Sequence, residues 1–264
     1  MPDPPANPGS EAMPEGDWTE RYAVDAGATS ITGTVREHNE DAACAHSEMG
    51  MVAVADGLGG HNAGEQASGI AIEVLERRLG EIRDAGASPT VEQMFEAFGE
   101  ANTEILQDAE ANPERAGMGT TLTCLVLVEN RVLVGHIGDS RAWRIRDGFA
   151  EQLTRDHTLV GQQVRDGSLT EEEAENHPMR HVLSRCLGVE PSIEVDLVEG
   201  DLDVDDIYVL ASDGLVHGLD GEAIARIAMR AKEAEEASSS LVNEACEIDG
   251  TDNITAAVLV CRER

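Results

Sequence analysis

The chain has 264 residues, enough to bury a sizeable core, and with only 3% aromatic residues the packing falls to Ala, Val, Leu and Ile. Nineteen basic residues against 52 acidic ones give a formal net charge of −33, which argues against nucleic-acid binding and against attachment to anionic membranes. The sequence has no run of about 18 apolar residues and no signal-peptide pattern at its start. We therefore expect a cytoplasmic protein, and we expect it to be a monomer.

Arginine supplies almost all of the positive charge, since Lys232 is the one lysine in the sequence. An acidic excess with so little lysine is typical of surfaces that work in concentrated salt, where self-repulsion is screened; a merely acidic mesophilic surface is the alternative. No glycine-rich loop precedes Lys232, which excludes a Walker phosphate loop and a kinase-type lysine. The five cysteines form no C-x-x-C pair, so we expect small buried hydrophobes rather than a zinc knuckle.

In chain order, residues 1–20 are rich in Pro, Gly, Ser and acids and predict a disordered tail, followed by one domain over 21–264. Apolar residues at helical spacing predict helices over 63–84, over 91–109, and over 222–247 with a break at the serines. Short helical pieces over 156–187 predict a flap. Short apolar runs predict strands at 22–26, 43–47, 51–55, 120–128, 131–137, 141–146, 193–198, 206–211 and 254–261.

The order of these elements indicates the fold class. Strands come mostly in adjacent pairs, and the helices are paired as well. This order favours an α+β protein with two antiparallel sheets covered by helices over a doubly wound parallel sheet.

Acidic residues directly at the ends of apolar strands are the informative ones in so acidic a chain. A carboxylate at a buried strand end is costly unless it is paired or coordinated, and a following glycine lets a backbone carbonyl approach a ligand. A single Asp-Gly is a common turn, but five such places together favour an all-oxygen site for a hard divalent cation. The five places are Glu40-Asp41, Asp56-Gly57, Asp139, Asp213-Gly214 and Asp252-Asn253.

Three other patterns fail. The segment Asp201-x-Asp203-x-Asp205 lacks the glycine and the glutamate of a calcium loop and predicts an acidic turn before a strand. The glycines at 57, 59, 60 and 64 do not form G-x-G-x-x-G, so a dinucleotide loop is not supported. His136 lies inside an apolar strand, which favours a packed residue over a ligand.

Seven motifs in order resemble the metal-dependent protein phosphatases of the 2C type, in their prokaryotic form. They are Val35-Arg36-x-x-Asn39-Glu40-Asp41, Ala55-Asp56-Gly57-x-Gly59-Gly60-His61-x-Ala63-Gly64-Glu65, Gly119-Thr120-Thr121, Gly138-Asp139-Ser140-Arg141, Leu153-Thr154-x-Asp156-His157, Ser212-Asp213-Gly214-Leu215 and Asp252-Asn253-x-Thr255. The resemblance implies a four-layer α-β-β-α sandwich with a flap at 156–187 beside the active site.

The resemblance also implies a binuclear Mn²⁺ or Mg²⁺ site with a weaker third ion. Asp56 would bridge the two ions and Gly57 would offer its carbonyl to one of them. The remaining implied ligands are Asp213 and Asp252 on the other metal, Glu40 and Asp41 at the cluster with at least one acting through water, and Asp139 at the third ion. For Asp139, an ion pair with Arg141 is the alternative.

The implied reaction is hydrolysis of phosphoserine or phosphothreonine in proteins of a kinase system. Metal-activated water would attack phosphorus in line while Arg36 holds the phosphate with its planar fork. The general acid is open, because eukaryotic relatives place His directly after the Asp-Gly pair, where this chain has Leu58. His61 is a candidate for the acid or a loop-structuring residue. A non-catalytic phosphatase-like regulator, a small-phosphoester hydrolase and a structural role are the alternative functions.

Overall fold

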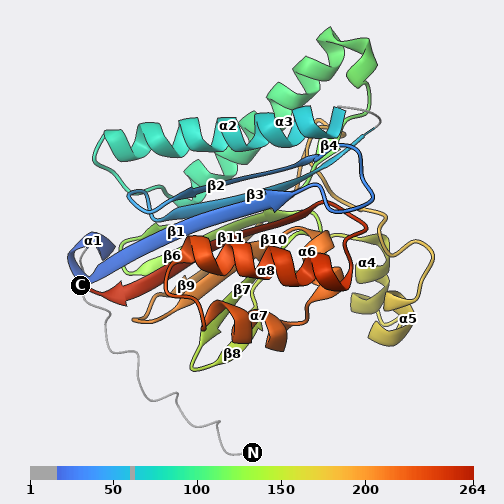
Figure 1. Cartoon of the computed structure of the whole chain (residues 1–264). Coiled ribbons are helices and arrows are strands. Elements are labelled where there is room, and N and C mark those ends of the chain that lie inside the picture. The colour runs from blue at the N-terminus through green and yellow to red at the C-terminus, as the bar shows by residue number, and fades with distance from the viewer. Residues whose placement is uncertain (1–16, 60–62) are drawn as a thin grey trace, which may run out of the picture.

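Two antiparallel sheets stack face to face in the computed structural model, which describes residues 17–59 and 63–264 (Figure 1). The five-stranded sheet has the order β1 (Tyr22–Ile31), β11 (Ile254–Glu263), β10 (Ile207–Ala211), β7 (Arg141–Arg146) and β8 (Phe149–Gln152). The six-stranded sheet has the order β2 (Asp41–His46), β3 (Met51–Leu58), β5 (Leu122–Val128), β6 (Arg131–Ile137) and β9 (Asp196–Asp201), with the short β4 (Gly119–Thr120) beside β3.

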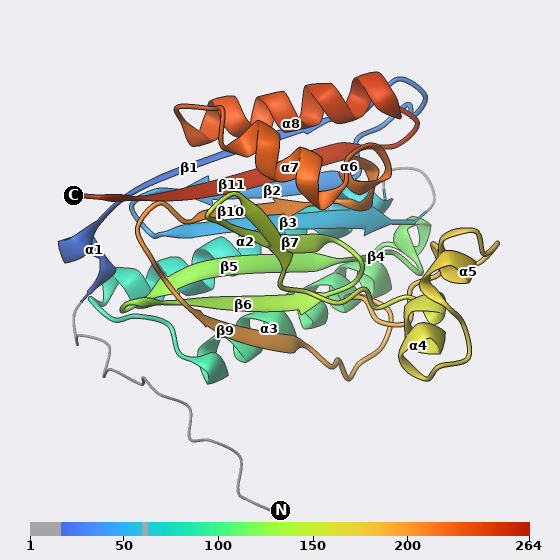
Figure 2. The same cartoon turned by 90° about the horizontal axis from the view of Figure 1, so that it is seen from below.

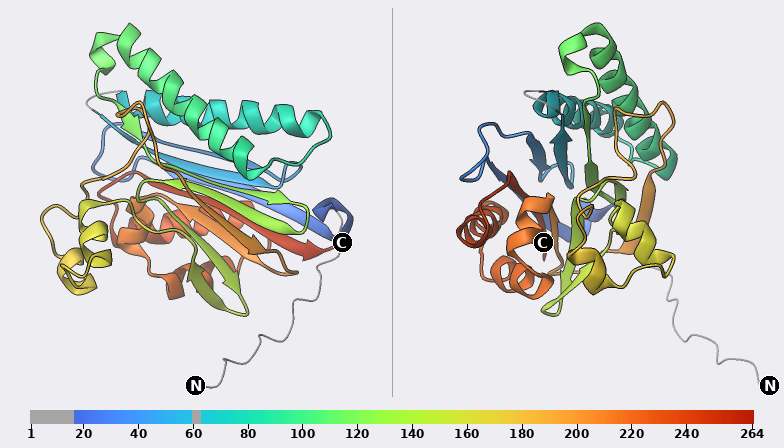
Figure 3. Two further views of the ribbon diagram at one scale, coloured as in Figure 1. Left: turned by 180° about the vertical axis from the view of Figure 1, so that it is seen from behind. Right: turned by 90° about the vertical axis from the view of Figure 1, so that its right-hand side faces the viewer.

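Helices cover the outer face of each sheet and complete four layers (Figure 3). The six-stranded sheet carries α2 (Ala63–Asp84) and α3 (Val91–Ala111), and the five-stranded sheet carries α6 (Asp213–Gly218), α7 (Gly221–Ala228) and α8 (Ala234–Ile248). The flap contains α4 (Leu159–Arg165) and α5 (Glu171–Glu175), which lie together at one end of the sandwich (Figure 2). The remaining short elements are α1 (Trp18–Arg21) and the 3₁₀ helix η1 (Pro113–Arg115).

The apolar strands are continuous because both of their faces are buried. In β3, Val52 and Val54 point between the sheets, whereas Met51, Ala53 and Ala55 pack under the helices α2 and α3. The central strand β11 divides its side chains between two clusters in the same way. Alternate residues of one strand therefore serve two cores, which explains the absence of polar alternation. Among the described residues, no helix is long and apolar enough to cross a membrane.

Most predicted elements are present, and the differences have local causes. The predicted strand 120–128 is divided at Thr121, whose hydroxyl accepts a hydrogen bond from the Asp56 amide. The break in 222–247 lies at 229–233, before the serines, because Ser238 turns inward and is fully buried in α8. The strand predicted at 193–198 starts later, at Asp196. The flap and the helix over 63–84 are confirmed.

The structured part of the chain begins earlier than predicted. Asp17 caps the short helix α1, and Trp18 packs between the sheets with 3% of its surface exposed. The prediction of disorder is therefore wrong for residues 17–20, where one buried indole outweighs the polar composition. Residues 1–16 lie outside the described part of the chain.

The acidic turn before β10 is built around Asp206, whose side chain is completely buried. Its carboxylate accepts two hydrogen bonds of 2.6 Å from the Arg146 guanidinium and one of 2.9 Å from the Tyr208 hydroxyl. The Asp203 amide donates a further hydrogen bond of 3.0 Å. Asp203 thus takes part in a turn before β10, as predicted for this segment.

We expect Asp206→Ala to lower the free energy of unfolding by about 3 kcal/mol, because it leaves a partly buried Arg146 without its partner. Denaturant titration measures this loss. Glu199→Ala, which removes an exposed ion pair with Arg131, is the control and should cost less than about 1 kcal/mol. Equal losses in the two variants would contradict the structural role of Asp206.

Candidate metal centre

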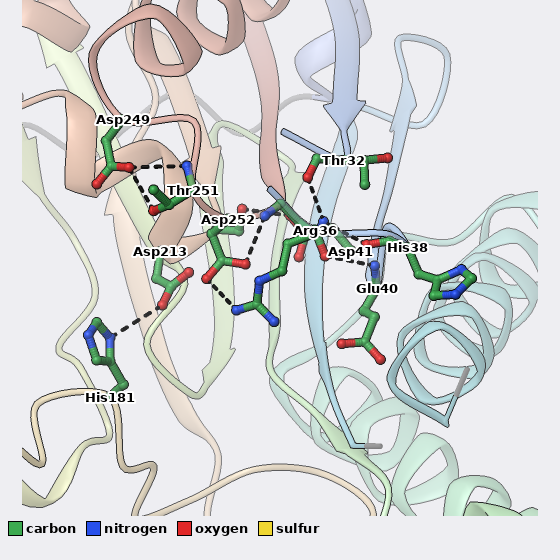
Figure 4. Close-up of polar contacts among 12 residues, drawn as sticks. Thr32, Arg36, His38, Glu40, Asp41, His181, Asp213, Asp249, Thr251 and Asp252 are labelled. Carbon is green, nitrogen blue, oxygen red and sulfur yellow. Dashed lines mark hydrogen bonds and ion pairs between the residues drawn. The ribbon is translucent and has the colours of Figure 1, made fainter. Parts of the chain in front are cut away.

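The acidic strand ends meet at one end of the sandwich, around a cavity of about 470 Å³. Figure 4 shows Arg36 in contact with Asp252, with Asp213 on one side of this pair and Glu40 on the other. The described residues that line the cavity are Arg36, Glu40, Asp56, Gly57, Leu58, Gly59, Thr121, Asp139, His181, Leu183, Asp213, Asp252 and Asn253. Five carboxylates and one guanidinium thus line the same cavity.

Asp41 lies at the first position of β2, directly opposite Asp56 of β3 in the antiparallel register. Its Oδ2 accepts hydrogen bonds from Ser212 Oγ at 2.8 Å and from Thr255 Oγ1 at 2.6 Å. Its Oδ1 is buried and has no hydrogen-bond partner among the described residues. Burial and the charges of Asp213 and Asp252 raise the pKa of Asp41 to about 7.

Asp56 ends the apolar part of β3 and is fixed by its backbone. The Asp56 amide donates to Thr121 Oγ1 at 2.9 Å, and its carbonyl accepts from the Thr121 amide at 2.9 Å. Burial and the neighbouring carboxylates, Asp41 first among them, raise the pKa of Asp56 well above its usual value. The carboxylate is thus held beside like charges without a compensating side-chain donor among the described residues.

Glu40 and Gly57 are brought together by close backbone contacts. The Gly57 amide donates to the Glu40 carbonyl at 3.1 Å, and the Ser68 hydroxyl of α2 donates to the same carbonyl at 2.6 Å. A Cβ at Gly57 would lie 2.2 Å from the Gly64 carbonyl oxygen, so only glycine fits. The Glu40 Oε1 is buried and, like Asp41 Oδ1, has no partner in the part of the chain that the structure describes.

Asp252 and Asn253 connect the loop over 32–40 to β11. Arg36 Nη2 donates to Asp252 Oδ2 at 2.8 Å (Figure 4). Asn253 accepts from the Glu40 amide at 2.9 Å, and its Nδ2 donates to the carbonyls of Thr32 and His38. Asn253 therefore positions Glu40, a role that the sequence motif contained but did not reveal.

Asp139 lines the cavity next to Asp213, and Arg141 does not pair with it. The Arg141 guanidinium instead makes a bidentate contact with Asp156, at 2.9 and 2.8 Å. Burial and the charges of Asp213 and Asp156 raise the pKa of Asp139 to about 8. The ion-pair alternative for Asp139 is therefore wrong, because Asp156 occupies the arginine fork.

Two histidines stand beside Asp213 that sequence reasoning did not place there. His181 of the flap has its Nδ1 3.9 Å from Asp213 Oδ2 (Figure 4). Its ring meets that of His217 edge to face. The two histidines come from segments far apart in the sequence, so no local sequence pattern could predict that they lie together. His136 is fully buried and hydrogen-bonded to Thr123, as predicted for a packed residue. His61, the candidate general acid, lies outside the described residues.

Comparison with known proteins identifies the fold and its family. A family model described as "Protein phosphatase 2C" matches residues 34–245. The chain belongs to the protein phosphatase 2C family. The match spans most of the chain and includes six of the seven predicted motifs completely, so it confirms the resemblance seen in the sequence.

Individual relatives of the 2C family agree with this assignment. The serine/threonine phosphatase stp of Listeria innocua is 33% identical over 231 residues, which are 86% of this chain and 92% of that protein. The crystal structure of the Mycobacterium tuberculosis phosphatase PstP/Ppp superimposes with a TM-score of 0.83 at 35% identity, covering 90% of this chain and 99% of that one. A structure of the PstP catalytic domain in complex with two manganese ions gives a TM-score of 0.80 at 34% identity, covering 91% and 99%. The predicted α+β sandwich is confirmed.

The 2C-type site in this chain has the donor set of a divalent-cation centre. Within residues 17–59 and 63–264, the buried oxygens Glu40 Oε1 and Asp41 Oδ1 have no donor, and a buried charged oxygen is costly unless it is paired or coordinated. The raised pKa values of Asp41, Asp56 and Asp139 arise from burial and mutual repulsion, which bound cations would remove. Oxygen ligands from carboxylates and a backbone carbonyl suit Mg²⁺ and Mn²⁺.

We expect Asp139→Asn to stabilise the metal-free protein, and to do so more at about pH 8 than at about pH 4. The folded chain keeps the Asp139 proton up to about pH 8, whereas the unfolded chain releases it above 3.8. The contribution of this group to the free energy of unfolding therefore falls as pH rises through that window. Denaturation midpoints in the presence of a chelator measure the difference.

The control is Asp147→Asn, at an exposed turn position with φ of 52° that suits Asn as well as Asp. It should show no pH-dependent gain. A gain for Asp139→Asn that is equal at both pH values would contradict the repulsive environment described for this carboxyl.

Proposed function

We propose that this chain hydrolyses phosphoserine and phosphothreonine in proteins, with two Mn²⁺ or Mg²⁺ ions held by the strand-end carboxylates. The family assignment gives the reaction class, a metal-dependent serine/threonine phosphatase. The observation that carries the proposal is the convergence of five carboxylates on one cavity. Two buried oxygens there, Glu40 Oε1 and Asp41 Oδ1, have no hydrogen-bond partner among the described residues.

The proposed ligands are those that the resemblance to the 2C family implies, and all of them except Asp41 line the cavity. Asp56 would stand between the two ions, Gly57 would add its carbonyl to one, and Asp213 and Asp252 would hold the other. Glu40 and Asp41 would complete the cluster, at least one of them through water, and Asp139 would hold a weaker third ion. When bound, the ions lower the pKa of a coordinated water and supply hydroxide near neutral pH.

Arg36 is proposed to bind the substrate phosphate. Its side chain is half exposed at the cavity mouth, and one nitrogen contacts Asp252. A planar guanidinium suits bidentate contact with two phosphate oxygens and neutralises charge on them in the transition state. Arg36 would exchange its contact with Asp252 for the phosphate when substrate binds.

The setting of the reaction is likewise a proposal. We infer a monomer that acts in cytoplasmic signalling, opposing serine/threonine kinases, in a cell interior of high salt. The acidic, lysine-poor surface supports the high-salt setting. We place the phosphatase domain from about residue 18 onward, because Trp18 packs into the core between the sheets.

Asp56→Asn should abolish metal-dependent phosphate release from a phosphothreonine peptide, with a loss of at least about 100-fold, because loss even of a ligand's hydrogen-bond partner costs about 10- to 100-fold. Wild-type release should itself disappear with a chelator. The exposed Asp147→Asn variant is the matched control and should keep full activity. Full turnover by folded Asp56→Asn would contradict the binuclear mechanism, and a metal-loaded wild type without turnover would indicate a non-catalytic regulator.

Arg36→Ala should raise KM about 10-fold or more and lower kcat less, since hydrogen bonds to charged groups contribute about 1.5–3 kcal/mol to binding. Arg36→Lys should recover only part of this, because an ammonium lacks the fork. Arg226→Ala, which removes an exposed ion pair with Glu244, is the control. Steady-state kinetics on the same phosphothreonine peptide measure KM and kcat. An unchanged KM in Arg36→Ala means that Arg36 does not bind phosphate.

The melting midpoint should rise between dilute buffer and molar KCl. The Debye length falls to about 3 Å at 1 M, so the acidic residues behind the net charge of −33 repel one another less. Sucrose at matched osmolality controls for effects of solute exclusion. A midpoint that falls with KCl would refute the high-salt setting.

A further inference from the structure

A second group of metal-ligand types lies under α2, on the outer face of the six-stranded sheet. Cys44 and His46 are two residues apart on β2, so both side chains point to the helix-covered face of the sheet. Glu76 of α2 lies over them. One donor atom from each of the three residues lies within 4.8 Å of the other two.

The three side chains already interact with one another. His46 Nε2 lies 2.6 Å from Glu76 Oε1, and the Cys44 sulfur lies within 4.8 Å of donor atoms of both residues. Cys44 is buried, with 7% of its surface exposed, whereas the side chains of His46 and Glu76 are about one-third exposed, at 30% and 39%. The cluster therefore combines a protected sulfur with an opening to solvent.

The donor chemistry separates this cluster from the catalytic cavity. A set of one thiolate, one imidazole and one carboxylate suits Zn²⁺, whereas the described residues that line the cavity offer carboxylates and the imidazole of His181 but no sulfur. Donor atoms around a tetrahedral zinc ion lie about 3.3–3.6 Å apart, as its bond lengths require. The partly exposed Glu76 carboxylate can open to that spacing by rotation. A plain His46–Glu76 ion pair beside a buried thiol is the alternative.

We propose that Cys44, His46 and Glu76 bind one zinc-like divalent cation, with a fourth position left to water. Binding would release the thiol proton of Cys44 to solvent and replace it with the metal–sulfur bond. The ion would join β2 to α2. These two elements start beside the catalytic cavity, since β2 begins at Asp41 and Gly64 of α2 packs against Glu40. The proposed ion is additional to the catalytic ions and does not depend on their assignment.

Cobalt(II) titration of the full chain in saturating Mg²⁺ tests the proposal. A sulfur-to-cobalt charge-transfer band in the near ultraviolet arises only from a thiolate ligand, so the catalytic cavity, with no cysteine among its described lining residues, cannot produce it. We expect the band to saturate at one equivalent and to disappear when Zn²⁺ is added. It should be absent in Cys44→Ser, and His46→Ala and Glu76→Gln should each weaken cobalt binding at least about 10-fold.

Two variants serve as controls. Cys246→Ser removes a partly exposed thiol on α8, and Asp56→Asn alters the catalytic cavity; both should keep the band. Zn²⁺ should also raise the melting midpoint of the wild type but not of His46→Ala. No band in the wild type, or a band of unchanged affinity in both His46→Ala and Glu76→Gln, would overturn the proposal, and either result remains informative if Cys44→Ser fails to fold.

Discussion

The carboxylate of Asp41 joins the two sheets at the end of the sandwich where the acidic residues meet. Asp41 belongs to the six-stranded sheet. Its two donors belong to the five-stranded sheet, where Thr255 lies on β11 and Ser212 directly follows β10. Thr255 is in turn hydrogen-bonded to Ser30, at 2.6 Å, so the contact is part of a longer network. Because Asp56 is paired with Asp41 and Asp213 follows Ser212, this one contact fixes the spacing of the carboxylates on both sheets.

The site brings like charges together in a chain that is already strongly acidic. Repulsion among the surface charges and repulsion among the cavity carboxylates are relieved in different ways. At the surface, charges stay in water and mobile salt screens them. In the cavity, burial weakens screening, and hydrogen bonds satisfy only one oxygen of Asp41 while leaving Oδ1 and Glu40 Oε1 without donors. Without bound cations, the raised pKa values of Asp41 and Asp139 let these groups keep protons up to about pH 7 and 8. Cations bound at fixed positions would balance the same carboxylates in their ionised form, which is why this arrangement favours metal chemistry.

The strand ends could be predicted from the sequence because each central strand is buried on both faces and reads as an unbroken apolar run that stops at an acid. The partners of those acids could not. Asn253, which positions Glu40, is 213 residues away from it in the sequence. Arg141 pairs with Asp156 and not with Asp139, and this pairing depends on the tertiary structure. Likewise β8, with mostly exposed residues, and the buried Trp18 depend on neighbours that local patterning does not contain. Roles in a site thus follow from packing, whereas its location follows from the pattern.

The same distinction explains why the cysteines read as simple core residues. Spacing rules detect ligands that share one local segment, but Glu76 reaches Cys44 and His46 only because α2 crosses β2 on the covered face of the sheet. Over six residues, β2 then carries oxygen donors at its start and sulfur and nitrogen donors near its end. Hard cations prefer the first set and zinc-like cations the second. One short strand can therefore separate two metals by donor type alone, without a barrier between the sites.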